Sequence, residues 1–440
     1  MKIVLRISML IMLLVVVCGC SKSRNGKEQI RNKEIRFLIW ENPRGIKQHE
    51  PLIKEFEKRN PSFKVKLEIT STSGSEKILT QAASNTLADV VQTVEENIVY
   101  FAQKGLIQPL DQFFTKGDPD FNINDFYESV VKQMTYKGKV WIVPKGGNTF
   151  VLYYNKKMFD EAKLKYPDET WTWTNFLAAA KALTKDKNGD GKIDQFGFLV
   201  DGGMGSLAVW LKGNGANYVS EDGKRVTINS PEAIYSLQFL IDLVKKYHVA
   251  PTMTEVSDVG WYEELFKMKK IAMFISGPYI RASFWNEKDL EWDIAPLPKG
   301  PKTRPYILAF CGWVMSKNTK YPKESWEFLK ILGGRLGARN FAKFGQDIPA
   351  INDKEAIDIW NDPTRKPEHV KVYIDCVKKG KHYFDPYNGA WTIAIGRYFS
   401  EAFELAMIGK KDLKDALDER MPEMQKSLDN FWKDFNSEVK

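Results

Sequence analysis

The chain has 440 residues, more than one compact core usually holds, which predicts two domains. Hydrophobic residues make up 43% and charged residues 28%; these are ordinary globular values, and they exclude the disordered and collagen-like classes. The formal net charge of +9 is spread along the chain without long runs of like charge, so nucleic acid is not expected as a partner.

Residues 1–19 have the pattern of an export signal. Lys2 and Arg6 form a short positive start, residues 7–17 form an apolar run, and the small Gly19 comes last. A positive start, a short apolar run and a small residue before the cleavage site are typical of a secretory signal peptide. The run is too short to span a bilayer comfortably as a helix.

The expected cleavage site carries a second signal. Residues 17–20 read Val-Cys-Gly-Cys, which resembles the lipobox of bacterial lipoproteins, where the last cysteine is lipidated and becomes the mature N-terminus. We therefore expect Cys20 to anchor the protein on the outer face of the cytoplasmic membrane. The alternative is a secreted protein with an unmodified Cys20. Residues 20–33 are polar and lack apolar periodicity until Ile35, which predicts a flexible lipid-anchored tether.

Strands and helices alternate along the rest of the chain. Residues 35–40 and 65–69 are predicted to be strands, and each is followed by a helix. This order predicts an α/β fold with a parallel sheet covered on both faces. Ser230 and Pro231 have the pattern of a helix start, with Ser as the cap and Pro in the first turn. Further strands are expected at 88–91, 140–143, 149–154, 271–275 and 293–295, and further helices at 75–85, 173–183, 234–247, 323–332, 353–360, 367–379, 391–408 and 411–436.

Cysteine and histidine usage argues against a metal site. Beyond Cys20, the mature chain has Cys311 and Cys376, which could form one disulfide, although their spacing does not establish it. We expect two free, buried thiols. The four histidines are scattered, and neither CxxC nor HExxH occurs, so no site built from these residues is expected.

Eight short sequence motifs between residues 56 and 300 occur in a characteristic order. They read FEKRNP at 56–61, ADV at 88–90, YKGKVWIVP at 136–144, YYNKKMF at 153–159, TWTW at 170–173, AAKALT at 179–184, AMFISGPY at 272–279 and PLPKG at 296–300. In this order they resemble the family 1 extracellular solute-binding proteins, which include the maltose- and oligosaccharide-binding subunits of ABC importers. Ala88, Trp141, Ile142 and Tyr279 depart from the usual residues of the family pattern.

The resemblance implies a fold and a function. The family has a two-lobed, periplasmic-binding-protein-like (type II) α/β fold, with hinge strands and a central ligand cleft. By analogy, lobe 1 spans 34–148 plus 309–353 and lobe 2 spans 149–308 plus 354–440, and the ligand would close the lobes. The implied function is that of a monomeric substrate-binding lipoprotein, not an enzyme, that captures a carbohydrate, in particular an oligosaccharide, and delivers it to the ABC permease subunits.

Three alternatives stay open at this point. One is a secreted lipoprotein enzyme that acts on carbohydrate, which would need two carboxylates at a set separation. Only the adjacent Glu95 and Glu96 offer such groups, and no nucleophile motif such as GxSxG occurs. The second is a binding protein for a non-sugar polyol, and the third is a scaffold that binds a protein partner.

Candidate ligand contacts combine aromatic and polar side chains, because a sugar offers apolar faces and a rim of hydroxyl groups. Open α/β sheets bind ligands at the carboxyl ends of their strands, which points to Trp40 and Glu41 after the first strand. Any single tryptophan could instead pack in the core or on the surface without contacting a ligand. The resemblance adds further candidates, which are Glu95, Glu96, Asn148, Tyr279, Trp313 and Trp391.

One polar loop fits the start of an EF-hand calcium loop. The oxygen ligands expected at alternating positions are Asp186, Asn188, Asp190, the backbone carbonyl of Lys192, and Asp194. Position 12 is Gly197 instead of the usual glutamate, so Gln195 or water would have to complete the shell. Some relatives bind structural calcium in such a loop, whereas no cofactor is required for binding. The alternative is a polar turn without an ion.

Overall fold

The computed structural model describes residues 33–40, 43–70, 75–257, 262–382 and 389–437. The expected signal peptide, Cys20 and most of the tether lie outside these ranges, as does Glu41. No helix in the described ranges is both long and apolar enough to cross a membrane.

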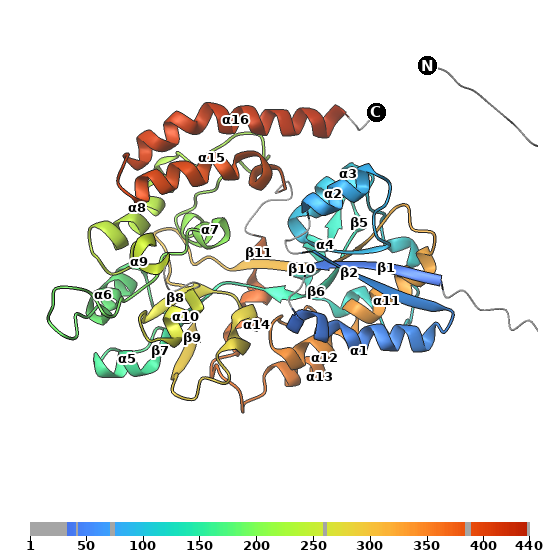
Figure 1. The fold of residues 1–440 in the computed structure, drawn as a ribbon, viewed down its shortest axis with the longest axis horizontal. Helices are drawn as coiled ribbons and strands as arrows, with labels where there is room; N and C mark the ends of the chain where they lie inside the picture. Colours follow the sequence, from blue (N-terminus) through green and yellow to red (C-terminus); the bar gives the residue numbers. More distant parts are fainter. Residues whose placement is uncertain (1–32, 41–42, 71–74, 258–261, 383–388, 438–440) are drawn as a thin grey trace, which may run out of the picture.

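The first sheet contains the predicted parallel strands. Strands β1, β2 and β3 run parallel, with β1 between the other two, and α1 and α2 connect them (Figure 1). Strand β10 pairs antiparallel with both β3 and β6, and its start pairs with the short β11. The bounds are β1 Lys33–Trp40, α1 Pro43–Arg59, β2 Phe63–Thr70, α2 Ser75–Ala83, β3 Val90–Val94, β6 Val143–Asn148, β10 Ile307–Met315 and β11 Lys381–His382.

Helices cover this sheet on both faces, as the apolar strands predict. Phe37, Leu38 and Ile39 are consecutive in β1 and all buried, which requires cover on both sides of the sheet. Phe328 of α11 packs against Phe37 and Phe56, with ring centroids 5.0 Å apart in each pair. Other elements of this half are α3 Ile98–Gln103, α4 Glu128–Met134, the hairpin β4 Thr135–Tyr136 and β5 Lys139–Val140, α11 Pro322–Gly333, α12 Arg335–Phe344, and the 3-10 turns η1 Glu95–Asn97, η2 Asp111–Phe113 and η3 Ile123–Asp125.

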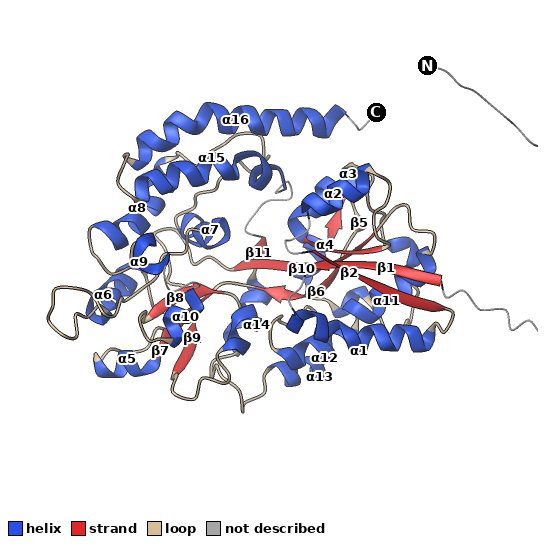
Figure 2. Ribbon diagram, in the orientation of Figure 1, coloured by secondary structure: helices blue, strands red, loops and turns tan. Residues whose placement is uncertain are grey.

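The second sheet has three strands and a larger helical cover. Strand β7 lies in its centre, antiparallel to β8 and β9. Leu152 and Tyr154 face a core shared with the surrounding helices, whereas Tyr153, on the opposite face, stacks on Phe274 and Trp292. Figure 2 shows the predominance of helix in this half. The bounds are β7 Val151–Asn155, α5 Lys156–Glu161, α6 Trp173–Leu183, α7 Met204–Gly213, α8 Pro231–Lys245, α9 Met253–Ser257, α10 Tyr262–Lys267, β8 Met273–Ser276, η4 Pro278–Ser283, β9 Trp292–Ala295, α15 Gly389–Met407 and α16 Leu413–Ser437.

Several helix starts follow their local sequence. The Ser230 side chain accepts a hydrogen bond from the backbone N–H of Ala233, which confirms the predicted cap of α8. Thr172 and Asn175 form a reciprocal capping box at α6. Trp173, in the first turn of that helix, is buried against Trp210 and Phe239.

The two halves are joined by extended strands. Residues 149–150 connect β6 directly to β7, and β10 runs back between the halves (Figure 1). A third connection contains α13 (Lys354–Trp360), which packs on α12, and α14 (Lys371–Lys379), which contacts α4 and β10. The predicted lobe boundaries remain a prediction, because residues 354–382 contact elements of both halves.

Cys311 and Cys376 are not joined in a disulfide, which confirms the expected thiols. Cys376 is buried, whereas Cys311 is only half-buried. Burial raises the pKa of the Cys376 thiol to about 12, so this group stays protonated at neutral pH.

Candidate functional site

The carboxyl ends of three strands meet at one edge of the first sheet. Strand β1 is parallel to β3, and β3 and β6 are both antiparallel to β10, so β1, β3 and β6 run in the same direction. Trp40 and Asn148 are the last residues of β1 and β6, and Glu95 and Glu96 directly follow β3, so all four lie at the same edge. This is the edge at which open α/β sheets bind ligands.

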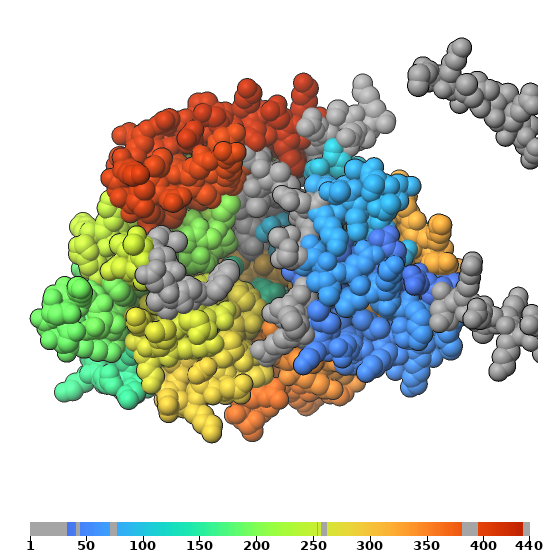
Figure 3. Space-filling model, in the orientation of Figure 1, coloured from blue at the N-terminus to red at the C-terminus, as the bar shows by residue number. Residues whose placement is uncertain are grey.

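Tyr279 lies at the corresponding edge of the second sheet. It follows β8, whose last residue Ser276 pairs with Val151 at the start of β7. A Cβ added to Gly277 would lie 3.2 Å from the backbone oxygen of Thr149, so this turn sits against the connection between the halves. Figure 3 shows that the surface is hollowed between the half that contains β1 and the half that contains α15 and α16.

Two predicted aromatic residues are accessible at these edges. Trp40 is half-buried, and its backbone N–H donates to Oε1 of Gln92 at 3.1 Å. Tyr279 is 43% exposed, and its hydroxyl accepts a 3.2 Å hydrogen bond from Oγ of Ser276. Exposed rings at a strand-end cleft can stack on the apolar face of a ligand.

The two predicted glutamates differ in their surroundings. Glu95 is buried, and its Oε2 accepts a 3.0 Å hydrogen bond from the backbone N–H of Phe310, which ties η1 to β10. Burial raises the pKa of Glu95 well above its usual range, and the nearby charge of Glu96 adds to this shift. Glu96 is half-buried. Of the pair, Glu96 is the better placed to meet a ligand.

Asn148 belongs to a polar cluster that sequence reasoning missed. Its Nδ2 donates to Oδ1 of Asp347 at 3.2 Å, and Oδ2 of Asp347 lies 3.3 Å from Nζ of Lys145. The side chains of Lys145 and Asp347 are only 4% and 6% exposed. Loss of one partner would leave the other charge buried without compensation and would destabilise the fold, so the two side chains depend on each other. No local pattern marks this cluster in the sequence, because Asn148 and Asp347 are 199 positions apart.

Trp313 is a correction to the predicted site. Its side chain is fully buried, and its ring packs against His49 and Phe341 at centroid distances of 5.9 and 5.6 Å. It therefore fills the core of the first lobe, where a ligand does not reach it. The side chains of two other candidates, Glu41 and Trp391, lie outside the described part of the chain, although α15 includes Trp391.

The predicted calcium loop forms an exposed turn held by its own carboxylates. The two side-chain oxygens of Asp186 accept backbone N–H groups of Gly189 and Gly191 at 2.7 and 2.9 Å. These bonds lower the pKa of Asp186, the bond from Gly191 most. Oδ2 of Asp194 accepts the N–H of Lys187 at 2.7 Å. The loop is thus folded into a compact, anionic turn.

The other predicted ligands of this loop are arranged less favourably. Asn188 Oδ1 accepts the backbone N–H of Asp190, whose own Oδ1 accepts that of Lys192. Gln195 is buried, and its Nε2 donates to the carbonyl of Leu183 at 2.7 Å. In the described chain, the carboxylates of this loop do not come together as a cluster of three metal-ligating groups.

Comparison with known proteins gives consistent matches. Residues 47–335 match the family described as bacterial extracellular solute-binding protein. The chain is 23% identical over 426 residues to a galactooligosaccharide-binding protein of Bacillus subtilis (strain 168), which covers 92% of each chain. It is also 23% identical over 355 residues to a maltodextrin-binding protein of the same organism, covering 77% of this chain and 78% of that protein.

Solved structures match over nearly the whole length. An ABC substrate-binding protein of Listeria monocytogenes in complex with cycloalternan matches with a TM-score of 0.76 and 24% identity, covering 92% of this chain and 99% of that chain. A structure of CpMnBP1 with mannotriose bound matches with a TM-score of 0.74 and 26% identity, covering 89% of this chain and 100% of that chain. The likeness confirms the predicted two-lobed α/β fold.

Proposed function

Because the chain belongs to the family of bacterial extracellular solute-binding proteins, we propose that it is the substrate-binding lipoprotein of an ABC importer and captures an oligosaccharide. The family consists of binding proteins that act outside the cytoplasm, and turnover of the ligand is not expected. The loaded protein delivers its sugar to the permease subunits in the membrane.

The observation that carries the sugar proposal is the pair of accessible aromatic rings at the strand-end edges of the two sheets. Trp40 ends β1, and Tyr279 follows β8 with 43% of its surface exposed. Flat aromatic faces suit the apolar faces of sugar rings, and Asn148 and Glu96 offer polar groups at the first of these edges. The relatives named for galactooligosaccharide and maltodextrin binding support the same ligand class.

Calorimetric titration with α-glucan, β-mannan and galactose-based oligosaccharides tests this proposal. We expect saturable binding of one class and no shorter sugars in the mixture after incubation. Trp40→Ala and Tyr279→Ala should each weaken binding by about 1–3 kcal/mol, as the loss of a buried aromatic contact does. Tyr235→Ala is a matched control, because Tyr235 is 57% exposed but lies on α8, away from both strand-end edges. Release of shorter sugars would show an enzyme instead.

We also propose that acyl chains on Cys20 hold the protein at the membrane. The lipobox-like residues 17–20 support this, and two or more chains are needed for a stable anchor. Detergent phase separation and mass spectrometry of the mature N-terminus test the anchor. The natural chain should enter the detergent phase, whereas Cys20→Ser should stay in the aqueous phase. An unmodified N-terminal peptide from the natural chain would contradict the proposal.

We further propose that calcium occupies the loop at residues 186–195. The compact anionic turn around Asp186 supports this, although its carboxylates would have to rearrange around the ion. Calcium should raise the melting temperature of the natural chain but not that of Asp186→Asn. Asp222→Asn is the control, since Asp222 is an exposed aspartate in a similar turn, bonded to Ser220 and Lys224. An equal melting temperature with calcium and with chelator would contradict calcium binding.

A further inference from the structure

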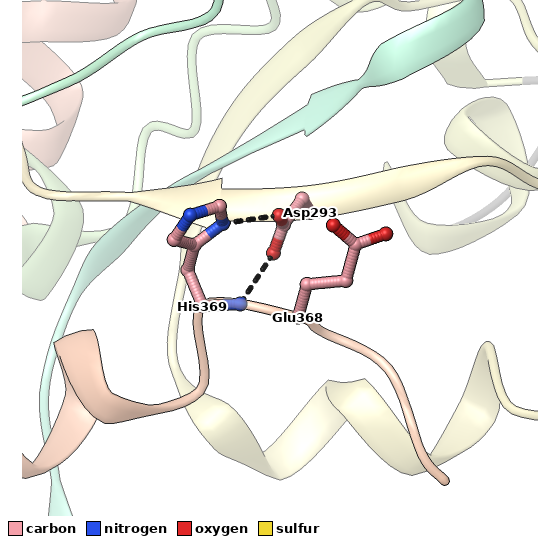
Figure 4. Close-up of side chains that lie close together, drawn as sticks. All are labelled: Asp293, Glu368 and His369. Atoms are coloured by element: carbon pink, nitrogen blue, oxygen red, sulfur yellow. Dashed lines mark hydrogen bonds and ion pairs between the residues drawn. The ribbon is translucent and has the colours of Figure 1, made fainter. Parts of the chain in front are cut away.

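A histidine and two carboxylates meet away from the strand-end edges, beside β9. Asp293 lies in β9, and Glu368 and His369 precede α14 on the third connection between the halves. Figure 4 shows the three side chains pointing toward one another. One ligand atom from each of them lies within 4.8 Å of the others, a grouping that no other histidine, cysteine or carboxylate set in the described ranges forms.

The central carboxylate is buried and held in a fixed orientation. Asp293 is 0% exposed, and its Oδ1 accepts the backbone N–H groups of Ile294 and His369 at 2.9 and 3.1 Å. Its Oδ2 lies 2.5 Å from Nδ1 of the His369 ring. The backbone bonds to Oδ1 orient the carboxylate, as hydrogen bonds to the non-ligating atoms do in metal sites. The ion would replace the hydrogen bond between Oδ2 and Nδ1.

The other two ligands are accessible from solvent. The side chains of His369 and Glu368 are 65% and 58% exposed, so an ion can reach them and they can adjust to it. Nζ of Lys156 lies 2.8 Å from Oε1 of Glu368. An ion that bound Glu368 would displace Lys156 from this carboxylate.

The donor set fits a transition metal better than calcium or magnesium. One imidazole nitrogen and two carboxylate oxygens are common ligands of Zn²⁺, whereas calcium and magnesium prefer oxygen alone. Two carboxylates also balance the charge of a divalent ion. Three protein ligands leave a fourth position for water, which the exposed side of the cluster can supply.

From this geometry we propose that Asp293, Glu368 and His369 form a binding site for Zn²⁺. The sequence contains no zinc motif, so the proposal rests on the contacts between these three side chains. The ion would join β9 of the second sheet to the connection that leads into α14. Since α14 contacts α4 and β10 of the first half, the site lies where an ion can stabilise the joint between the halves.

Titration of the untagged mature chain with Zn²⁺, in competition with a chromophoric chelator, tests the proposal. We expect one Zn²⁺ per chain, and Co²⁺ in its place should give visible absorption bands of a low-coordinate N/O site. His369→Asn should weaken binding by about 10-fold to 100-fold or more. His248→Asn, which changes an exposed histidine outside the cluster, should leave binding unchanged.

A second variant distinguishes the loss of a metal ligand from misfolding of the chain. Glu368→Gln changes an exposed side chain, so circular dichroism should match that of the natural chain while zinc binding weakens. The proposal is overturned if the natural chain binds no Zn²⁺. It is equally overturned if His369→Asn and Glu368→Gln bind it as tightly as His248→Asn does.

Discussion

At the scale of single residues, His49 is held neutral by its surroundings. Its ring lies in the first lobe's core among Phe37, Trp313 and Phe341. Its Nδ1 lies 2.8 Å from the carbonyl of Gly45, to which the neutral ring can donate. Burial, with a smaller contribution from the charge of Lys145, lowers the pKa of His49 to about 3.

This pKa predicts acid sensitivity. The unfolded chain takes up the proton near pH 6.5, whereas the folded chain resists it down to about pH 3. The neutral ring therefore contributes its full stabilisation of the folded state above pH 6.5. This contribution is lost as the pH falls from about 6.5 toward 3. His49→Asn keeps a donor for Gly45, lowers stability at pH 7, and should reduce the slope of stability between pH 6 and 4 by about 1.4 kcal/mol per pH unit.

Urea unfolding at several pH values measures this slope. His248→Asn serves as control, because His248 is exposed and its replacement should leave the slope as it is. If the natural chain and His49→Asn lost stability in parallel on acidification, protonation of His49 would not contribute.

The effect of Glu95 on stability has the opposite pH dependence to that of His49. Its folded-state pKa is raised by burial, so the folded chain gives up this proton less readily than the unfolded chain. Stability is therefore lost as the pH rises above the unfolded value of about 4.3 and toward the folded one. Glu95→Gln keeps an acceptor for the N–H of Phe310 and should stabilise the ligand-free chain at pH 8 by on the order of 1 kcal/mol.

The gain should shrink at pH 5, because this pH lies close to the unfolded pKa of about 4.3, where folding changes the protonation of Glu95 less. Glu221→Gln, which changes an exposed carboxylate, should have no such pH-dependent effect. Thermal unfolding at both pH values measures the difference. A loss of stability in Glu95→Gln at pH 8 would show that the charged form is the one the fold favours.

At the scale of elements, a ladder of cations and aromatic rings joins η4 to α13. The guanidinium of Arg281 lies 4.0 Å from the ring centroid of Trp360 and 5.2 Å from that of Trp285. Arg365 lies over Trp285 at 4.7 Å. Arg281 is buried, and its contact with two ring faces offsets part of the cost of removing its charge from water.

Gly345 connects this ladder to α12. It ends that helix with a φ of +68°, a conformation that favours glycine. A Cβ at this position would lie under 3.0 Å from two ring carbons of Trp285. Gly345→Ala should therefore destabilise the chain by about 2–4 kcal/mol, from backbone strain and overpacking together.

A matched control separates the two causes. Gly117 has a φ of +79°, and nothing lies within 4 Å of a Cβ there, so Gly117→Ala should cost only about 1 kcal/mol. Chemical denaturation measures both variants. If Gly345→Ala and Gly117→Ala lost the same amount of stability, Trp285 would move aside without cost. The ladder would then not depend on α12.

At the scale of the whole molecule, the two halves are joined unequally. Near the strand-end edges, residues 149–150 and β10 are the connecting segments. Elsewhere, one hydrophobic cluster includes residues of both halves, such as Phe37 and Trp292. The hydroxyl groups of Tyr153 in β7 and Tyr373 in α14 are hydrogen-bonded to each other. When the halves close, they should therefore rotate about the side that contains this shared cluster and the Tyr153–Tyr373 hydrogen bond.

Small-angle scattering of the mature chain tests this motion. Saturation with a sugar that binds should reduce the radius of gyration, because ligand binding favours the closed state. A sugar of the same size that does not bind should leave the radius unchanged. If a bound sugar left it unchanged too, the halves would not close on the ligand.

The sequence by itself determined the features that depend on near neighbours. The order and spacing of apolar residues predicted β1, α1, β2, α2 and β3, and Ser230-Pro231 predicted the start of α8. These signals are local, because periodicity and helix caps act within a few residues. The ordered motifs predicted the family and its two-lobed fold. The strand-end rule placed Trp40 at the edge where β1, β3 and β6 meet.

Only the tertiary structure decided which side chains are buried together. Trp313 follows Gly312 and Tyr279 follows Gly277-Pro278, and both were ligand candidates, yet Trp313 fills a core and Tyr279 is exposed. The contacts of Asn148 with Asp347 and of Asp293 with His369 join residues 199 and 76 positions apart. Burial and long-range pairing depend on how distant segments pack, and no local pattern carries that information in a single sequence.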